Sequence, residues 1–434
     1  MRPSPDSRPP AGIRRSGSKR TAGKRGLLAL VLALSALALG RTAAAQALEL
    51  DSRVTMFHEP AKGSTMTVYT PSTDLTARPW DFLAVTGGWE ADIVSGASER
   101  VKTGPLSRAG PDAITWASIK DVRHIGRGSV TLKRDVAELR AGGSVSVEND
   151  YKSNSFNAAA KTDLFQHSTQ LELAYARNWD TVCDLAHTAN TDATLRQPLD
   201  TSEGCFQPNS TTRSEVPIRT DAFQMTWSQA WTPVLTTQAV YTGQLQSGLL
   251  SDPYRAVSLS PGGQYAQEHH PANRARQAVA LRGAYYIRPL KGAVRAGIRG
   301  YRDTWHIWSA TFELEGEKYI FPWLRLRATG RYYRQTAALF WSDDYTGGEP
   351  NYGPRGQYWS GDREISPFSS YLVGARAIGS WRAAEQRIAG IFEGLQVGLG
   401  FDVLFYAYSD FTLGGRKPAD TTAYIGSLSF TALF

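Results

Sequence analysis

The chain has 434 residues and a formal net charge of +8, because 48 lysines and arginines outnumber 40 aspartates and glutamates. Residues 1–45 carry nine of the basic residues and one of the acids, so the remainder has 48 − 9 = 39 basic and 40 − 1 = 39 acidic residues. The chain beyond residue 45 is therefore neutral. Its charge gives no argument for binding to nucleic acid or to anionic lipid.

The first residues have the three parts of a secretory signal peptide. Basic residues occupy Arg14–Arg25, an apolar run follows over Leu27–Gly40, and small residues surround Ala45. We expect residues 1–45 to be this leader, with cleavage near 45/46 or 47/48. The apolar run is shorter than the roughly 20 residues that a membrane-spanning helix needs. The pair Arg14–Arg15 leaves twin-arginine export as an alternative.

Beyond the leader, apolar and polar residues alternate, and a period of two is typical of strands. Gly, Pro, Asp and Asn bound the alternating segments. A helical period is confined to a short segment, 380–391. The pattern predicts sixteen strands, at 50–58, 64–77, 80–95, 121–134, 136–151, 155–163, 168–179, 217–232, 234–245, 274–287, 291–302, 304–317, 323–341, 366–379, 393–409 and 421–434.

The predicted connections differ in length according to side. Alternate connections, such as Arg78–Pro79, Thr232–Pro233 and Lys318–Pro322, are short turns. The long connections all fall on the opposite side, at 96–120, 180–216, 246–273 and 342–365. Short periplasmic turns, long external loops and an even strand number are typical of outer-membrane barrels. We therefore expect the long connections to be external.

The faces of the predicted strands support the same class. In 291–302, Val294, Ala296 and Ile298 lie on one face, whereas Arg295 and Arg299 lie on the other. A barrel in lipid needs an apolar exterior and tolerates a polar lumen. Residues 46–434 are therefore predicted to form an all-β, transmembrane, antiparallel up-and-down β-barrel of about 16 strands. Its location would be the outer membrane of a Gram-negative-type bacterium.

The last strand ends the chain on an aromatic residue, Phe434. Tyr424, Leu428 and Phe430 share its apolar face, and serine or threonine residues occupy the other. In an exported protein this pattern favours the closing strand of an outer-membrane barrel. The expected partners are outer-membrane lipid and the barrel-assembly machinery, which would contact the C-terminal strand. No nucleic-acid partner is expected.

Two cysteines, Cys183 and Cys205, lie in the polar connection 180–216. Because an exported chain reaches an oxidising compartment, we expect a disulfide between them. Two free thiols or half of a metal site are the alternatives. No zinc-type spacing supports the metal site.

Charged residues on three neighbouring strands predict a ladder inside the lumen. Folding 304–317 back on 323–335 would bring Glu313 opposite Arg327 and Glu315 opposite Arg325. The ladder is completed by neighbouring arginines, which are Arg295, Arg299 and Arg331, with Arg274, Arg276 and Arg282 one strand further. One interpretation is a set of cross-strand ion pairs that stabilises the wall. The other is a basic stripe that selects anions.

Motifs for catalysis and for metal binding are sparse. The sequence has no Gly-x-Ser-x-Gly, no Walker loop and no His-Glu-x-x-His motif. The cluster Glu268–His270 could bind a metal, but a solvated loop cluster is the simpler interpretation. Asp344 lies in a segment with only a faint likeness to a calcium loop. We expect no enzyme activity, no metal and no cofactor, with an enzyme at the barrel rim as an alternative.

Several segments resemble one bacterial family known only as a domain of unknown function (DUF thirty-five-seventy). The segments are Tyr69–Ser72, Asp92–Ser98, Asp121–His124, Ser146–Ser153, Gly248–Arg255, Tyr301–Trp305, Arg331–Gln335 and Ile365–Phe368. Asn149 stands where an acidic residue is more usual, and 180–216 is long. The resemblance implies an outer-membrane barrel and no assigned activity. The family's gene neighbours include flavin-attaching enzymes and small periplasmic thiol proteins, which implies an envelope redox system.

Polar residues near the loop ends of several strands predict a rim network. Its members are Asp92, Glu148, Asp150, Tyr151, Asp252, Tyr254 and Arg255. A structural lock between loops and wall is one interpretation, and a ligand site is the other. For the whole protein we expect a non-enzymatic pore or small-solute channel with weak anion preference. The alternatives are a structural or docking barrel for a periplasmic or lipoprotein partner, and the rim enzyme.

Overall fold

A computed structural model describes residues 47–60, 65–95, 114–115, 120–188, 190–259, 265–342, 357–383, 387–409 and 421–434. All of them belong to one compact unit, Gln46–Phe434. The predicted leader and the region around Asp344 lie outside the described residues. No helix in the described ranges is long and apolar enough to cross a membrane.

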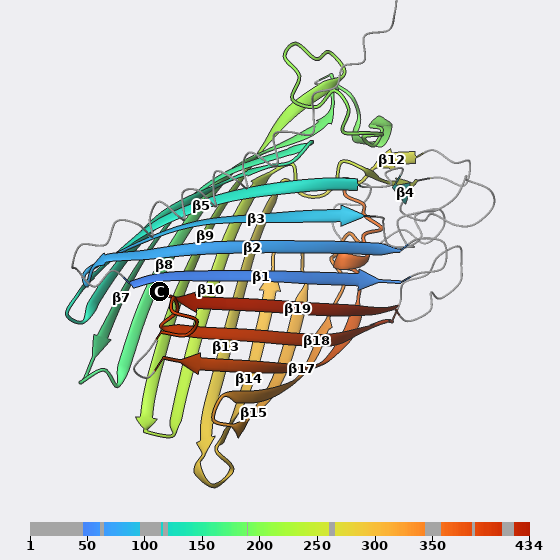
Figure 1. The fold of residues 1–434 in the computed structure, drawn as a ribbon. Coiled ribbons are helices and arrows are strands. Elements are labelled where there is room, and N and C mark those ends of the chain that lie inside the picture. Colours follow the sequence, from blue (N-terminus) through green and yellow to red (C-terminus); the bar gives the residue numbers. More distant parts are fainter. Residues whose placement is uncertain are drawn as a thin grey trace, which may run out of the picture. The chain divides into compact units, whose positions relative to one another are not determined.

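Sixteen antiparallel strands of the described residues close into a barrel (Figure 1). They are β1 (Ala47–Glu59), β2 (Met66–Trp80), β3 (Leu83–Ser95), β5 (Lys120–Arg134), β6 (Ala137–Val147), β7 (Tyr151–Leu164), β8 (Thr169–Leu185), β9 (Arg213–Thr232), β10 (Leu235–Gly248), β13 (Asn273–Ile287), β14 (Gly292–Asp303), β15 (Trp308–Phe321), β16 (Leu324–Gln335), β17 (Phe368–Arg382), β18 (Gly394–Tyr408) and β19 (Thr421–Leu433). Each barrel strand pairs with the next one along the chain, and β1 pairs with β19. The predicted antiparallel up-and-down barrel of sixteen strands is confirmed.

The barrel has two unlike ends. At the end that we call the turn end, consecutive strands join through short turns, and β1 begins where β19 finishes, with Glu49 opposite Leu433. Lysine, aspartate and histidine residues adopt a positive φ in several of these turns, for example Asp135 and Lys291. The other end, the loop end, carries the four long connections that follow β3, β8, β10 and β16.

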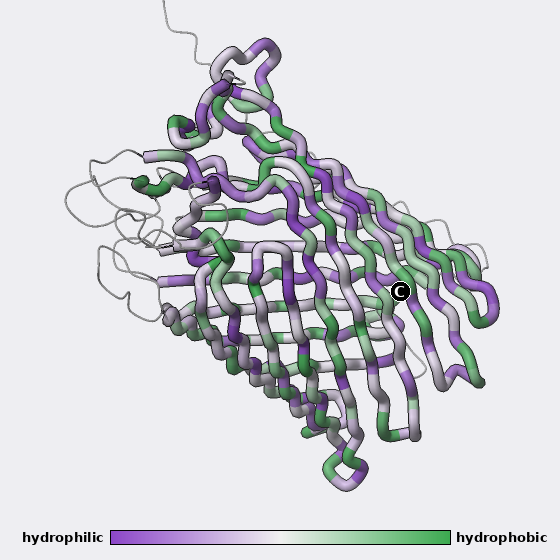
Figure 2. Tube along the Cα trace, turned by 180° about the vertical axis from the view of Figure 1, so that it is seen from behind, coloured by the Kyte–Doolittle hydropathy of each residue, from purple (hydrophilic) through white to green (hydrophobic). Residues whose placement is uncertain are grey.

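Neighbouring residues along each strand point to opposite faces of the barrel wall, and Figure 2 shows the resulting alternation of hydrophilic and hydrophobic positions. The outward face is apolar: Leu173, Val373 and Leu399 are 60%, 63% and 64% exposed. Exposed apolar surface that runs over neighbouring strands is typical of a face that meets lipid or another protein. A few apolar side chains face the lumen instead, and Ile378 and Leu404 are buried there.

Aromatic side chains gather on the outward face at the turn end. Trp80 and Trp231 are exposed at the ends of β2 and β9, and Trp323 stacks on Trp381 with ring centroids 5.8 Å apart. This arrangement is typical of the aromatic belt of a membrane protein. Trp341 does not belong to this belt, because it is partly buried in a loop and packs against a cluster around Trp305.

Some predicted strand boundaries are wrong. The predicted strand 323–341 ends at Gln335, because residues 336–341 leave the barrel and place Ala338 and Phe340 in the cluster around Trp305. The predicted strand 304–317 is displaced and runs over Trp308–Phe321 as β15. In the described part of 380–391, a strand end and a turn stand where a short helix was considered.

The loop end has a small sheet of its own. It contains β4 (Ile114–Thr115), β11 (Arg255–Ser258) and β12 (Tyr265–Gln267), which pair in the order β12, β11, β4. The part of the chain that the structure describes also has three short 3₁₀ helices: η2 (Ala193–Leu195), η3 (Arg288–Leu290) and η4 (Arg363–Ile365). Packing of Val257, Ala266 and Trp359 gives the small sheet a hydrophobic core, so the long connections are ordered against one another.

Candidate functional site

The lumen wall formed by β14, β15 and β16 carries a ladder of charge pairs centred on Glu317. Its carboxylate lies 3.4 Å from Arg295, 3.2 Å from Arg325 and 2.7 Å from Arg327. Glu315 also pairs with Arg295, and its carboxylate lies 3.4 Å from the Nε of Arg327. The predicted ladder residues thus share one face, with Glu317 as an additional member.

The predicted register of this ladder is wrong. Glu313 lies opposite Arg331 and not Arg327, and Glu315 lies opposite Thr329 and not Arg325. The physical reason is the turn. Strand β15 continues through the predicted turn 318–322 to Phe321, which pairs with Leu324, so only two residues connect the strands. The tighter turn changes the register, so each glutamate of β15 lies opposite a residue of β16 that is four positions later than predicted.

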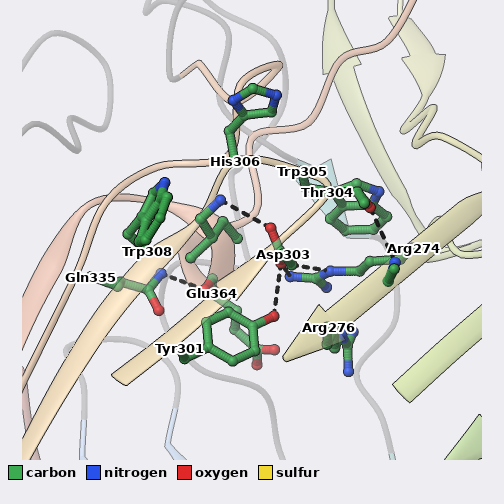
Figure 3. Close-up of polar contacts among 12 residues, drawn as sticks. Arg274, Arg276, Tyr301, Asp303, Thr304, Trp305, His306, Trp308, Gln335 and Glu364 are labelled. Carbon is green, nitrogen blue, oxygen red and sulfur yellow. Dashed lines mark hydrogen bonds and ion pairs between the residues drawn. The ribbon is translucent and has the colours of Figure 1, made fainter. Parts of the chain in front are cut away.

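A second polar cluster surrounds Asp303 at the loop end of β14 (Figure 3). Arg274 donates to the Asp303 carboxylate from Nε at 2.9 Å and from Nη2 at 2.5 Å, and the Tyr301 hydroxyl donates at 2.7 Å. The backbone N–H of Ile307 donates to the same carboxylate at 2.9 Å. The Arg274 guanidinium also lies 3.9 Å from the ring centroid of Trp305. These contacts saturate the Asp303 carboxylate and fix the turn before β15.

The opposite lumen wall is balanced in charge. Arg127 bridges two carboxylates, with Nη2 2.6 Å from Asp74 and Nη1 3.0 Å from Glu90. Glu138 bridges two cations, at 3.2 Å from Arg140 and 3.3 Å from Lys161. A cavity of about 740 Å³ along this wall is lined by four basic and four acidic side chains, which are Arg78, Arg127, Lys133, Arg140, Asp51, Asp74, Asp81 and Glu138.

The wall formed by β13 to β16, which we call the basic wall, lines a cavity of about 890 Å³ inside the barrel. Its charged lining consists of Arg282, Arg295, Arg299, Arg331, Glu313 and Glu315, which gives 4 − 2 = +2. Among the described residues, Arg282, Arg299 and Arg331 have no carboxylate within ion-pair distance, unlike Arg295. Arg282 and Arg299 are exposed to the lumen. This cavity can therefore offer free guanidinium groups to an anion.

Buried ion pairs join the loops at the loop end, and we call this set the loop lock: Arg363 with Glu59, and Arg255 with Asp362 and Asp252. Arg363 of η4 donates two hydrogen bonds to Glu59 at the end of β1, at 2.8 and 3.0 Å. Arg255 pairs with Asp362 and lies 3.2 Å from Asp252. The connection between β10 and β13 thus contacts the loop that precedes β17, which itself is tied to β1.

The electrostatics of this lock follow from burial and pairing. Burial alone would raise the pKa of Asp362, but the Arg255 guanidinium holds it below its usual value. Burial raises the pKa of Asp252, although Arg255 opposes the shift. The negative charge of Asp362, followed by burial, raises the pKa of Glu364. Arg255 is therefore shared among carboxylates and favours the ionised form of Asp362.

The structure divides the predicted rim network. Tyr254 donates to the Asp150 carboxylate, which joins the β10–β13 connection to the turn before β7. Asp92 instead accepts from the Thr70 hydroxyl at 2.7 Å on the barrel wall.

The other members have local contacts. Tyr151 lies under the Arg123 guanidinium, with 5.8 Å between Cζ and the ring centroid, and its backbone carbonyl accepts from the N–H of Glu148. Asp252 and Arg255 belong to the loop lock described above. Four of the seven residues are therefore joined, because the Tyr254 N–H also donates to Asp252 at 2.9 Å and so connects Asp150 to Asp252 and Arg255, whereas Asp92 lies apart on the barrel wall.

The disulfide between Cys183 and Cys205 is confirmed. It closes the segment after β8, whose Leu199 donates its N–H to the Pro253 carbonyl at 2.7 Å. In the same region Gln267 donates to Asp184 at 2.8 Å. The long connection after β8 is thereby fixed against the small sheet.

The candidate metal cluster is part of this packing. Glu268 is buried and accepts from the Ser360 hydroxyl at 3.0 Å and from the Gly361 N–H at 3.1 Å. His270 lies 3.6 Å from Glu268, and His269 packs against Trp359. In the described ranges, no group of three or more His, Cys, Asp or Glu side chains is arranged to hold a metal ion.

Sequence reasoning missed Glu59, Asp362 and Arg363, although they carry much of the loop lock. No local signal marks them, because their partners are distant in the sequence. It also missed Arg127 as a bridge on the opposite wall. The alternation of Asp74 and Glu90 with apolar neighbours could have placed both carboxylates on the lumen face.

Solved structures with some likeness to this chain are outer-membrane proteins. A bacterial polysaccharide outer membrane secretin has 8% identity and a TM-score of 0.48, with 90% of this chain and 98% of that chain covered. OccK2 (OpdF) of Pseudomonas aeruginosa has 10% identity and a TM-score of 0.41, with 90% and 98% covered. A BenF-like porin of Pseudomonas fluorescens Pf-5 has 9% identity and a TM-score of 0.41, with 90% and 99% covered. At these scores the likeness assigns no function.

The sequence comparisons give a family without an activity. No curated protein matches the chain. The family described as Protein of unknown function (DUF3570) matches residues 27–380, which is most of the chain. The resemblance found in the sequence motifs is thereby confirmed, and the chain belongs to the DUF3570 family.

Proposed function

We propose that the protein is a pore of the bacterial outer membrane that passes small solutes with a weak preference for anions. The closed barrel pairs its backbone groups, and its outward face is apolar, as a lipid environment requires. The N-terminal segment 1–45 would direct export and be removed. The C-terminal strand ending in Phe434 would then be recognised by the barrel-assembly machinery.

The free arginines of the 890 Å³ cavity carry the proposal. Barrels of 16–18 strands are wide enough to leave an aqueous channel. Rings or stripes of arginine in a channel favour anions. Because the opposite wall is balanced in charge, the excess of two positive charges on the basic wall decides the sign of the preference.

The locked loops limit the size of the solute. Contacts such as Arg255 with Asp362 and Leu199 with Pro253 hold long connections against one another at the loop end. We assign this end to the outside of the cell, because outer-membrane barrels carry their long loops there. Solutes would therefore pass between ordered loops before they reach the arginines.

Planar lipid bilayers test the proposal. The purified protein should give discrete conductance steps, and a salt gradient should give a reversal potential on the anion side. The double variant Arg282→Gln/Arg331→Gln should shift that potential towards cations. Arg334→Gln is the matched control, because its side chain leaves the opposite face of β16 from Arg331. Absence of conductance would remove the pore, and a cation-selective wild-type protein would remove the anion preference.

A further inference from the structure

The inward side chains around the 890 Å³ cavity form rows across neighbouring strands. One row contains Arg282, Gly297, Glu313 and Arg331, which are successive register partners on β13 to β16. Two arginines without carboxylate partners among the described residues thus flank a glycine and a glutamate. Since three strand spacings of about 4.8 Å separate them, the two arginines lie roughly 14 Å apart along the wall.

The next row towards the loop end adds aromatic rings to an arginine. Its members are Arg299, Thr311, Tyr333, Ser370 and Tyr406, which are register partners on β14 to β18. Two residues along a strand span about 7 Å, so this row lies about that far from the first. A free guanidinium and aromatic rings therefore share one row, with further guanidinium groups below it.

An aromatic cluster continues from this row towards the loop end. Phe368 has its ring centroid 5.6 Å from that of Tyr333, 5.9 Å from that of Tyr406 and 5.6 Å from that of Tyr408. Phe368, Tyr333 and Tyr406 all line the cavity. The cavity is thus aromatic on the side nearer the loops and basic on the side nearer the turns.

The positions of the guanidinium groups and of the aromatic rings indicate which ligand the cavity would bind. A guanidinium binds a carboxylate through two parallel N–H donors, and it does so best where competing ion pairs are absent. Phenylalanine and tyrosine rings pack against another ring or a flat apolar group. The geometry points to a binding site for small monocarboxylates with an aromatic or flat apolar body, the carboxylate at Arg299 and Arg331 and the body against Phe368. This inference rests on the proposed pore for the route by which the solute arrives.

Glu313 sets the charge of the preferred ligand. Its side chain is exposed in the cavity and, among the described residues, has no ion-pair partner. A carboxylate between two arginines reduces the positive potential and repels a second negative charge on the solute. A single carboxylate therefore fits the site better than two.

Titration calorimetry on the folded protein in detergent tests the site without requiring conduction. The probes are phenylacetate, acetate and 2-phenylethylammonium, which separate the contributions of the ring and of the charge. Phenylacetate should bind at least tenfold more tightly than acetate, and 2-phenylethylammonium should not bind. Equal binding of all three probes, or no binding of phenylacetate, would overturn the site.

Variants assign the binding to residues. Arg299→Gln should weaken phenylacetate binding about tenfold, whereas Phe368→Leu should weaken it about threefold and leave acetate unchanged. Arg325→Gln is the matched control, because it removes the same charge from the lumen but lies outside the cavity and pairs with Glu317. It should change the affinity by less than twofold. An equal loss in Arg299→Gln and Arg325→Gln would show a general charge effect and refute the site.

Bilayer recordings separate failure of the site from failure of the pore. If conductance is seen, phenylacetate should block it at concentrations where acetate does not, and Arg299→Gln should relieve the block. Binding without conductance would keep the site and remove the pore. Conductance with anion preference but without binding or block would keep the pore and remove the site. Heat-modifiability on gels confirms that every variant is folded.

Discussion

At the scale of single residues, two glutamates of β15 have opposite roles although they are four positions apart on one face. Glu317 lies within 3.4 Å of three arginines, so its carboxylate holds the guanidinium groups together. Glu313 lies opposite Arg331 but, among the described residues, forms no ion pair. The first residue stabilises the wall, and the second adjusts the potential of the cavity.

A pair of charge-matched variants separates these roles. Glu317→Gln and Glu313→Gln each remove one negative charge from the lumen, so both should shift the reversal potential further towards anions. Only Glu317→Gln removes a carboxylate that three arginines share, and although Arg295 and Arg327 keep Glu315, Arg325 loses its partner. It should destabilise the barrel by about 1–3 kcal/mol, the usual cost of losing hydrogen bonds to a charged group.

The temperature at which the folded band disappears on unboiled gels measures this difference. Glu317→Gln should lose the folded band at a lower temperature than the wild-type protein, and Glu313→Gln should not. Equal thermal losses in the two variants would contradict the ladder as a structural device.

At the scale of elements, β8 and β9 extend past the neighbouring strands at the loop end, and a long loop connects them. β8 runs to Leu185 and β9 starts at Arg213, with Leu185 opposite Arg213 at the end of the ladder. The disulfide closes the segment beyond them across a separation of 22 residues. This segment contacts the small sheet through Leu199 and Pro253. The bond therefore ties this loop to the loop-end extension of β8, in which Cys183 lies.

Reduction of the disulfide should make the loop between β8 and β9 more mobile and leave the barrel folded. Closing a loop of this length stabilises it by about 3 kcal/mol in the chain-entropy description. Dithiothreitol, or the double variant Cys183→Ala/Cys205→Ala, should expose new protease sites within 186–212. The sequence has no other cysteine, so the reductant acts on this bond alone. Unchanged proteolysis, or loss of the heat-modifiable band, would disprove the assignment.

At the scale of the whole molecule, the two faces of the wall face different solvents. Leu173 is 60% exposed on the outer face of β8, and its neighbour Ala174 lines a lumen cavity of about 620 Å³. The same outward exposure of apolar residues recurs on other strands, as at Val373 of β17 and Leu399 of β18. A closed wall of this kind separates an apolar exterior from a wet interior.

Adjacent arginine substitutions test this two-sided wall. Leu173→Arg would place a charge against lipid and should destabilise the barrel by about 2–4 kcal/mol, the cost near the bilayer midplane. Ala174→Arg would place the same charge in the lumen, beside the inward Glu172, and should be tolerated. The yield of folded protein after refolding into lipid vesicles distinguishes them. Equal yields would mean that the outer face does not meet lipid.

Most of the barrel could be predicted from the sequence because the face of a strand residue is a local property. Residues such as Arg295 and Val294 take opposite faces whatever their neighbours are, since the period is two. Strand number, the segregation of long loops and the inward position of the arginines follow from that period. The predicted strand boundaries are wrong where tertiary packing outweighs the period of two. Ala338, for example, is buried against the cluster around Trp305, so β16 ends before it.

The sequence by itself therefore determined a sixteen-stranded wall with a charged interior and a family without an assigned activity. Only the tertiary structure decided which charges are paired. A turn of two residues after Phe321 moved Glu313 from Arg327 to Arg331, and strands far apart in the chain brought Arg299 to the same row as Tyr406. The contact between Glu59 and Arg363 in the loop lock likewise joins residues that are 304 positions apart in the sequence. Register and closure are long-range properties, because they depend on turn geometry and on contacts that no local period encodes.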